Sequence, residues 1–424
     1  MSAAAPSLVL RNVAIAPSVR GFDATAGRFD VHIQNHTVCK IFPTGPVLEN
    51  TANSGANPGS VFIQNGTLLP ALVDLHVHID KTFVVDETGP CEGDLLAGIG
   101  LMAQHRSQWS AAHIHTRMER ALQQAYGHGT RALRTHLDWM DATPPKALAV
   151  WEALRNTWRD RLTQQAVSLT PLDYFDDVAG SAALAQHVAD ANQRCDTTSG
   201  EAVLLGAFVY RNTGMEPKLQ RVFDLASLHG LNLDFHVDEG LDPDACGLRT
   251  IARLALRQQF KGRITCGHVC SLAMQPLDEA LETLQLCKEA QMDLVSLPST
   301  NLYLQGAWDQ TPVPRGITRL TEANAIGLKT SIATDNVADG FFPYGSYDLL
   351  DNWALGVQAA HLSPADAWLA AATTHPAQAM GLPWNGKIAE GCPADLVLLN
   401  AQSPFELISP QGRQRRIIRA GKLL

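Results

Sequence analysis

The stretch Leu72-Val73-Asp74-Leu75-His76-Val77-His78 is an apolar, β-strand-like run that ends in two histidines. Seven similar runs follow it, and longer patterns typical of helices lie between them. The eight runs cover residues 72–77, 130–135, 166–170, 203–209, 231–235, 263–266, 294–297 and 329–333. Near-continuous apolar strands that alternate with helices are typical of a parallel sheet covered by helices. Eight such units over roughly 310 residues predict an α/β fold, a (β/α)8 TIM barrel.

An open, doubly wound sheet is the alternative arrangement of the same elements. Such a sheet usually carries a glycine-rich phosphate-binding loop after an early strand. The chain contains neither G-x-G-x-x-G nor G-x-x-x-x-G-K-[ST], which favours the closed barrel.

Both ends of the chain carry short alternating segments that are typical of small β units. They cover residues 8–13, 28–33 and 37–41, then 394–400 and 416–422, with a turn-rich stretch at 51–60. Neither end is long enough to bury a good core alone. We therefore expect one small β-sandwich domain formed from both termini, residues 1–67 plus 383–424. Residues 68–382 would form the catalytic barrel domain.

The composition excludes several classes of protein. The chain has 424 residues, and 33 Lys and Arg against 42 Asp and Glu give a formal charge of −9. Nucleic acids and anionic membranes both attract a positive surface, so we expect neither as a partner. No apolar run approaches the ~20 residues that span a bilayer. The first residues lack the features of a signal peptide, and the eight cysteines are scattered, so we expect a cytoplasmic protein with reduced thiols.

Titratable side chains follow several of the predicted strands at the point where each strand ends. His76 and His78 point to the same face of their strand because they are two residues apart. His236 follows the fifth run and Asp335 follows the eighth. Barrel active sites are built at the carboxyl ends of the strands. Three imidazoles and one carboxylate suit Zn²⁺ or Fe²⁺ with one position open for water.

We therefore predict one divalent metal ion, bound by His76, His78, His236 and Asp335. A site with two metals would need a bridging group, often a lysine on the fourth strand, and residues 203–210 contain none. A bound metal lowers the pKa of its water and makes a hydroxide nucleophile. We expect Glu239 to shuttle protons, His268 to hydrogen-bond the water or the developing oxyanion, and Asp335 to receive the proton of the water.

These motifs resemble those of the amidohydrolase superfamily. The resemblance rests on His76-Val77-His78, His236-Val237-Asp238-Glu239, Gly267-His268, Thr334-Asp335 and the tail Gly391-Cys392-Pro393-Ala394-Asp395-Leu396-Val397. The cytosine deaminase-like branch, which includes N-alkylammelide amidohydrolases, is the most similar. The resemblance implies a barrel with a small β-sandwich, a hydrolase of carbon–nitrogen bonds other than peptide bonds, and a homo-oligomer.

The resemblance also points to residues that would bind the substrate. Phe341 stands where an aromatic side chain covers the substrate in the family, and Asn336 replaces the second of two aspartates. Leu172 and Asp173 occupy the segment after the third strand, where cytosine deaminases carry a glutamine. Asp138, after the second strand, either faces the substrate or supports its neighbour His136.

These departures favour a substrate other than cytosine. The stretch Asp80-Lys81-Thr82-Phe83 resembles the branch that removes alkylamines from hydroxylated triazines. We predict a metal-dependent deaminase of a small amino-substituted nitrogen heterocycle, pyrimidine-, triazine- or pterin-like, in which a metal-bound hydroxide displaces ammonia. Two alternatives stay open. The first is hydrolysis of a cyclic amide or of an N-alkyl substituent on a related ring, and the second is a non-catalytic homologue.

Overall fold

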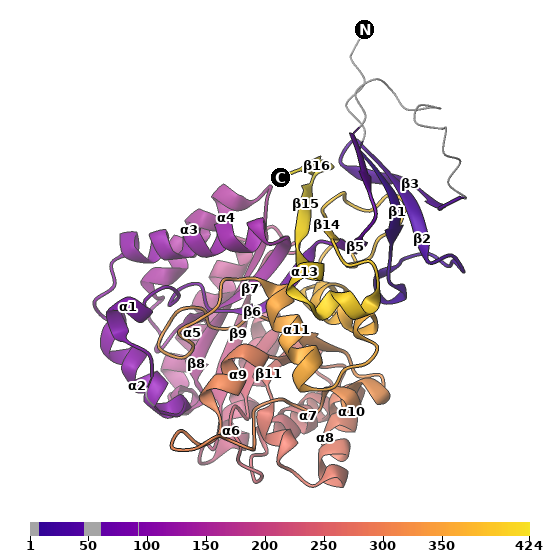
Figure 1. Cartoon of the computed structure of the whole chain (residues 1–424). Coiled ribbons are helices and arrows are strands. Elements are labelled where there is room, and N and C mark those ends of the chain that lie inside the picture. The colour runs from indigo at the N-terminus through magenta and orange to yellow at the C-terminus, as the bar shows by residue number, and fades with distance from the viewer. Residues whose placement is uncertain (1–7, 46–60, 92) are drawn as a thin grey trace.

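Eight parallel strands form one of the two sheets of the computed structural model (Figure 1). In chain order they are β6 (Leu72–Val77), β7 (Thr130–Asp138), β8 (Thr163–Pro171), β9 (Ala202–Val209), β10 (Leu233–Val237), β11 (Ile264–His268), β12 (Asp293–Ser296) and β13 (Thr330–Ile332). Each strand pairs in parallel with the next, and a further parallel bridge joins Val77 to Asp335. This bridge returns the end of the sheet to its first strand, so the predicted (β/α)8 barrel is confirmed.

The structure describes residues 8–45, 61–91 and 93–424. The turn-rich stretch expected at 51–60 lies outside the described residues. Among the helices that the structure describes, none is both long and apolar enough to cross a membrane.

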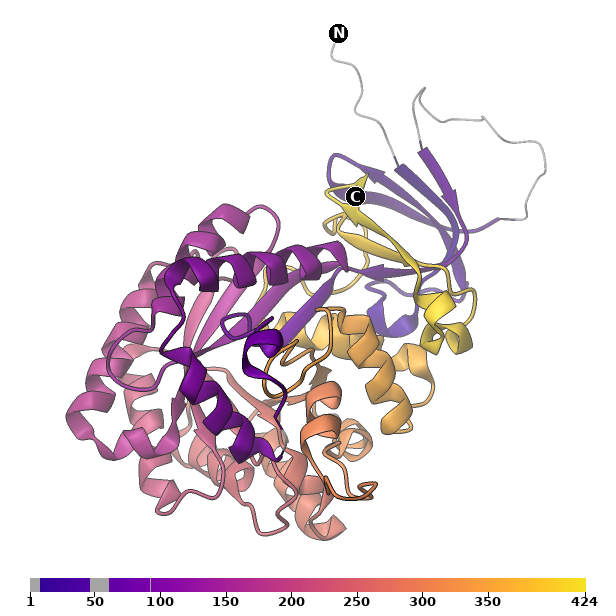
Figure 2. The same cartoon turned by 60° about the vertical axis from the view of Figure 1, so that its left-hand side comes forward.

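Helices wrap the outside of the barrel (Figure 2). The long ones are α3 (Ala111–Gly127), α4 (Lys146–Trp158), α5 (Val178–Gln193), α6 (Met215–His229), α7 (Gly247–Gln258) and α8 (Leu277–Glu289). Helix α7 shows how sequence spacing places them. Its residues Leu248, Ile251, Ala252 and Ala255 recur at intervals of three and four and are all buried. That spacing gives the helix one apolar face, which packs on the barrel.

Two long connections stand at the carboxyl ends of the barrel strands. β6 is followed by α1 (Val85–Thr88) and α2 (Leu95–Arg106), and β12 by α9 (Pro298–Leu304) and α10 (Leu320–Ala325). Of these, α2 and α9 reach the mouth of the barrel, where active sites of this fold are built, and α10 packs outside the barrel against α8 and β13.

Strands from both ends of the chain form a second, mixed sheet beside the barrel (Figure 1). It contains β1 (Leu8–Ala14), β2 (Arg28–Gln34), β3 (Thr37–Pro43), β4 (Val61–Gln64), β5 (Thr67–Pro70), β14 (Leu396–Leu399), β15 (Arg415–Arg419) and β16 (Lys422–Leu423). β14 pairs antiparallel with β5, which joins the two ends of the chain. The small domain therefore is built from both termini, as expected.

The core of the small sheet continues into the helices that follow the barrel. Phe29 and Val31 belong to one buried cluster with Trp353 of α11 (Leu349–Ala359) and Leu369 of η4 (Ala365–Ala372). The remaining elements are η1 (Pro17–Val19), η2 (Leu172–Asp176), η3 (Cys270–Ala273), α12 (Thr374–Met380), η5 (Pro404–Ile408) and α13 (Pro410–Arg413). The division into residues 1–67 plus 383–424 and residues 68–382 stays a prediction.

Candidate active site

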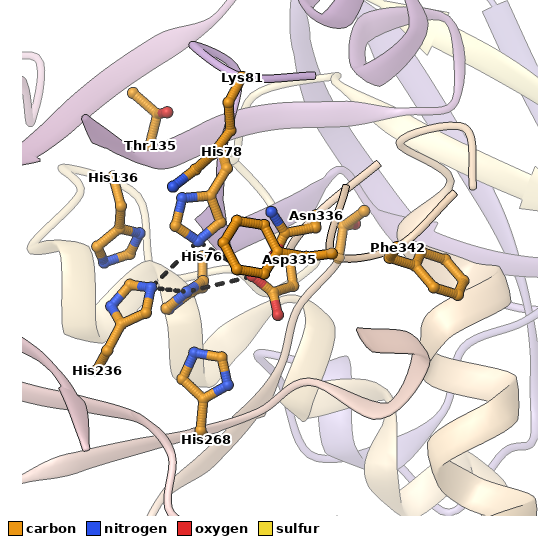
Figure 3. Close-up of polar contacts among 12 residues, drawn as sticks. His76, His78, Lys81, Thr135, His136, His236, His268, Asp335, Asn336 and Phe342 are labelled. Carbon is orange, nitrogen blue, oxygen red and sulfur yellow. Dashed lines mark hydrogen bonds and ion pairs between the residues drawn. The ribbon is translucent and has the colours of Figure 1, made fainter. Parts of the chain in front are cut away.

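The four predicted metal ligands converge at the carboxyl ends of the barrel strands (Figure 3). His236 Nε2 lies 3.2 Å from His76 Nε2 and 3.1 Å from His78 Nε2. An Asp335 carboxylate oxygen lies 3.5 Å from His76 Nε2 and 3.2 Å from His78 Nε2. All four side chains are buried.

This arrangement fits a small divalent cation. Ligands about 2.0–2.1 Å from a tetrahedral metal lie about 3.3 Å from one another, which matches these separations. Burial lowers the pKa of His76, His78 and His236 well below the usual range, so their imidazoles are neutral. Neutral imidazoles are the form that binds metals. The ring nitrogens and the carboxylate oxygen lie close together, but neutral imidazoles and a carboxylate carry few protons for hydrogen bonds between them. A cation would bind the lone pairs that remain.

A fourth histidine lies behind this group. The ring of His136 is 3.9 Å from that of His76, centre to centre, and its Nε2 lies 3.2 Å from Asp234 Oδ1. Asp234 also pairs with the buried Arg134 at 2.7 Å. His136 was predicted only as a neighbour of Asp138, although it stands near the end of β7 as the predicted ligands stand near the ends of their strands.

The backbone at two of the site residues lies in the left-handed region. The φ angle is 67° at Asp335 and 71° at His268. This region is uncommon for residues other than glycine, and such residues cluster at functional sites. The geometry at the strand ends is therefore fixed by the backbone as well as by side-chain packing.

Glu239 and His268 face one another beside the candidate metal ligands. Glu239 Oε1 lies 3.1 Å from His268 Nδ1 and accepts a hydrogen bond from Asn301 Nδ2 at 3.3 Å. Burial, with the negative charge of Asp335, raises the pKa of Glu239 well above its usual range. Burial lowers the pKa of His268 to about 4. The environment therefore favours the protonated form of Glu239, and His268 is neutral at neutral pH.

A pocket opens next to these groups. Its wall includes His78, His236, Glu239 and His268, the predicted substrate residues Asp138, Asn336 and Phe341, and the apolar side chains Leu95, Ile99, Leu169 and Phe208. Asn336 donates from Nδ2 to Asp339 Oδ2 at 2.6 Å. This bond uses one of the two N–H donors of the Asn336 amide, so the side chain can still accept through its oxygen and donate through its second N–H to a ligand.

The structure does not bring Leu172 and Asp173 to this pocket. Leu172 is fully buried in the apolar core. Asp173 is exposed at the surface and pairs with Lys218 at 2.6 Å. The reason is that β8 extends to Pro171, and η2 then turns Leu172 inward and Asp173 outward. Pro171 and Leu169 line the pocket instead.

Sequence reasoning missed three polar residues of the site. Lys81 and Arg106 line the pocket, and Asn301 contacts both Glu239 and His268. Lys81 lies in the loop after β6 and Asn301 lies in α9 after β12, so a search extended from the strand ends into the connections that follow them could have found both. Arg106 gave no such signal, because it is the last residue of helix α2.

A family model and several known proteins are similar to this chain. A family model described as "Amidohydrolase family" matches residues 121–422. A pterin deaminase from Rhizobium rhizogenes (strain K84 / ATCC BAA-868) is 34% identical over 428 residues, which cover 99% of this chain and 94% of that protein. An N-isopropylammelide isopropyl amidohydrolase from Pseudomonas sp. (strain ADP) is 27% identical over 371 residues, which cover 84% of this chain and 85% of that protein.

A solved structure shares the fold along the whole chain. The 5-methylcytosine deaminase from Klebsiella pneumoniae, liganded with phosphonocytosine, superposes with a TM-score of 0.82 at 24% identity. The match covers 98% of this chain and 97% of that one. The family model spans well over half of the chain and a relative matches almost all of it, so this protein belongs to the amidohydrolase family.

Proposed function

We propose that this protein is a metal-dependent hydrolase that deaminates a small amino-substituted nitrogen heterocycle and releases ammonia. It acts on carbon–nitrogen bonds other than peptide bonds. The observation that carries the proposal is the convergence of His76, His78, His236 and Asp335 in one pocket with Glu239 and His268. The similarity to deaminases and amidohydrolases supports it.

His76, His78, His236 and Asp335 would hold the divalent cation. When bound, such a cation acts as a Lewis acid and activates water for attack on the ring carbon that bears the amine. Zinc or iron as the metal, a cytoplasmic location and a homo-oligomeric assembly stay predictions from the sequence.

Glu239 would act on the substrate as a proton donor, and His268 as a hydrogen-bond donor. The raised pKa of Glu239 favours its protonated form, which can deliver a proton to a ring nitrogen or to the departing amine. His268 has its Nε2 buried without a hydrogen-bond partner among the described residues, and it lines the pocket. That atom is free to donate to the oxygen that develops negative charge in the tetrahedral intermediate. Asn301 hydrogen-bonds both side chains and so fixes their relative position.

A flat ring would lie between apolar side chains in this pocket. Phe341 and Ile99 belong to its wall, and Asn336 and Lys81 supply the polar contacts. Lys81 Nζ stands 5.4 Å from the centre of the Phe341 ring. A lysine offers only donors, so we expect a carbonyl oxygen or an unprotonated ring nitrogen on that side of the substrate. Because a pterin deaminase is 34% identical over 99% of this chain, a pterin-like ring is the first candidate.

The test is metal analysis of the purified protein, followed by assays on a panel of pterin, cytosine, amino-triazines and N-alkylated triazines. We expect ammonia from a ring amine, activity that is lost with a chelator, and recovery when Zn²⁺, Fe²⁺ or Mn²⁺ is returned. Release of an alkylamine or opening of the ring would favour the alternative hydrolase. Full activity in metal-free protein would contradict the mechanism, and no turnover with the metal bound would favour a non-catalytic homologue.

A further inference from the structure

Gly98 of helix α2 is the point where this helix meets Phe341 at the wall of the candidate active-site pocket. A Cβ at position 98 would lie 2.8 Å from Cδ1 and 3.1 Å from Cε1 of the Phe341 ring. Carbon atoms in contact lie about 3.5–4.0 Å apart, so a side chain here would have to displace the ring. Leu95 and Ile99 of the same helix line the pocket together with Phe341. The lack of a side chain at Gly98 therefore decides where this part of the wall lies.

The main chain on the Phe341 side of this contact is held in place. The backbone N–H of Phe341 donates to Asp339 Oδ1 at 2.9 Å. Gly340, the residue before Phe341, is buried, and a Cβ there would lie 2.8 Å from Sδ of Met102 in the same helix. A methyl group at position 98 would thus be met by the Phe341 side chain rather than by a shift of its backbone.

Helix α2 is also held near both ends. Before its first turn, the backbone N–H of Cys91 donates to the carbonyl oxygen of Gly340 at 2.9 Å. At its last residue, Arg106 Nη2 pairs with the buried Asp138 at 2.6 Å. A shift of the whole helix away from Phe341 would strain both contacts, so we expect the ring to be the part that moves.

The Phe341 ring has space to move on its pocket side. The ring belongs to the pocket wall, and α2 blocks it at Gly98. Lys81 Nζ stands over the ring, 5.4 Å from its centre, and lines the same pocket. A ring that turns away from α2 therefore moves into the pocket and reduces the space left for a ligand.

Loss of space at this wall should matter most for a large ring system. The reacting carbon has to lie beside the candidate metal ligands, and His78 and His236 line the same pocket. The second ring of a two-ring substrate then extends farther along the walls than a one-ring substrate does. A two-ring substrate therefore depends on Phe341 staying against Gly98, whereas a single ring has more room to adjust.

We infer that Gly98 is a specificity-determining residue, which keeps the pocket wide enough for a two-ring heterocycle because it lets Phe341 lie directly against α2. The inference rests on the proposed deaminase function and adds the size of the ring system that the site accepts. A side chain as small as a methyl group at this position shifts the preference toward one-ring substrates.

The test measures the binding of two rings that carry no amine to be released. Lumazine is the two-ring product that deamination of pterin gives, and uracil is the one-ring product from cytosine. Their dissociation constants are measured on protein loaded with Zn²⁺, and kcat/KM for pterin is measured in parallel. We expect Gly98→Ala to weaken lumazine binding by about tenfold or more, the size of a typical overpacking effect, and uracil binding by less. The kcat/KM for pterin should fall by a similar factor.

Two further variants isolate the contact. Gly100→Ala makes the same change in the same helix, at an exposed position where nothing lies within 4 Å, and should behave like the wild type. Alanine is a better helix former than glycine, so neither substitution should unfold α2. Phe341→Ala removes the ring, and adding Gly98→Ala to it should change lumazine binding and kcat/KM for pterin by less than about twofold, because no ring is left to displace.

The outcomes separate this inference from the proposed function. No turnover of any ring would contradict the proposed function, and the inference would fall with it. Turnover of one-ring substrates alone, without lumazine binding, would overturn the inference and leave the proposed function standing. Wild-type values in Gly98→Ala, equal weakening of lumazine and uracil, or a loss that persists in the Phe341→Ala background would each overturn the role assigned to Gly98.

Discussion

The backbone N–H of Asp335 donates a hydrogen bond of 2.9 Å to the carbonyl oxygen of His76. One of these residues follows the last barrel strand and the other stands in the first. Beside this contact, the Asp74 carboxylate accepts from the backbone N–H of Thr334 at 3.0 Å. The seam of the barrel is therefore closed through the candidate metal site, and two of its ligands are held at a fixed separation by main-chain bonding.

Loss of one candidate ligand should remove the metal and the activity together. His236→Ala takes away the Nε2 that lies within 3.2 Å of both other imidazoles. We expect the metal content of the purified variant to fall and kcat/KM to drop by about a thousandfold or more, since the cation supplies several kcal/mol of transition-state stabilisation. His115→Ala, on the exposed face of α3, should keep both. Wild-type turnover in His236→Ala would show that His236 is not a ligand.

Replacing the proton carrier should separate catalysis from metal binding. Glu239→Gln keeps the shape of the side chain and can still accept from Asn301, but it cannot transfer a proton. We expect kcat to fall by about 10²–10⁴-fold, the usual range for a lost general acid or base. Metal content should stay at the wild-type level in the same sample. A variant with unchanged kcat would assign proton transfer to another group.

A methyl group at Gly267 should displace the candidate ligand His76 without changing the chemical groups of that ligand. A Cβ at this position would lie 2.8 Å from both Cε1 and Nδ1 of His76. Gly267→Ala should therefore push the His76 ring and lower metal affinity by about 10–100-fold, as lost support around a ligand does. Competition with a chromophoric chelator measures this. Gly127→Ala, where nothing lies within 4 Å, should bind metal like the wild type.

Two substitutions should change the pH dependence of stability in opposite directions. Burial raises the pKa of Asp339 to about 7, from 3.8 in the unfolded chain. The stability that this carboxyl contributes is present below pH 3.8 and is lost as the pH rises through about 7. Relative to the wild type, Asp339→Asn should therefore gain stability between these pH values, by at most about 1.4 kcal/mol per pH unit.

Stability should depend on pH in the opposite direction at His375. Burial lowers its pKa below 6.5, so its contribution is present above pH 6.5 and is lost as the pH falls. His375→Gln should lose less stability than the wild type on acidification. Urea midpoints at pH 4, 5, 6 and 7 measure both slopes, and parallel curves for Asp339→Asn and the wild type would contradict the buried, protonated state of Asp339.

Sequence spacing alone determined the barrel and the four candidate ligands. Side chains repeat their direction every two residues in a strand and every 3.6 residues in a helix, and these periods are visible in short segments of sequence. Residues 72–77 and the seven later runs could therefore be recognised one by one. Because every strand of a parallel barrel ends at the same mouth, a titratable residue at a strand end such as His236 could be placed near His76 without coordinates.

The sequence placed Asp138, Asn336 and Phe341 at the candidate pocket, but only the tertiary structure decided which other residues line it. Leu172 and Asp173 follow the end of β8, but η2 turns Leu172 into the core and Asp173 to the surface. Arg106 reaches the pocket from the end of α2, which no local period predicts. The hydrogen bond from the Asn336 amide to Asp339 has no counterpart in a local sequence pattern either. These outcomes depend on contacts between residues whose side-chain directions are set by loops and by neighbouring elements, and a local sequence pattern does not encode them.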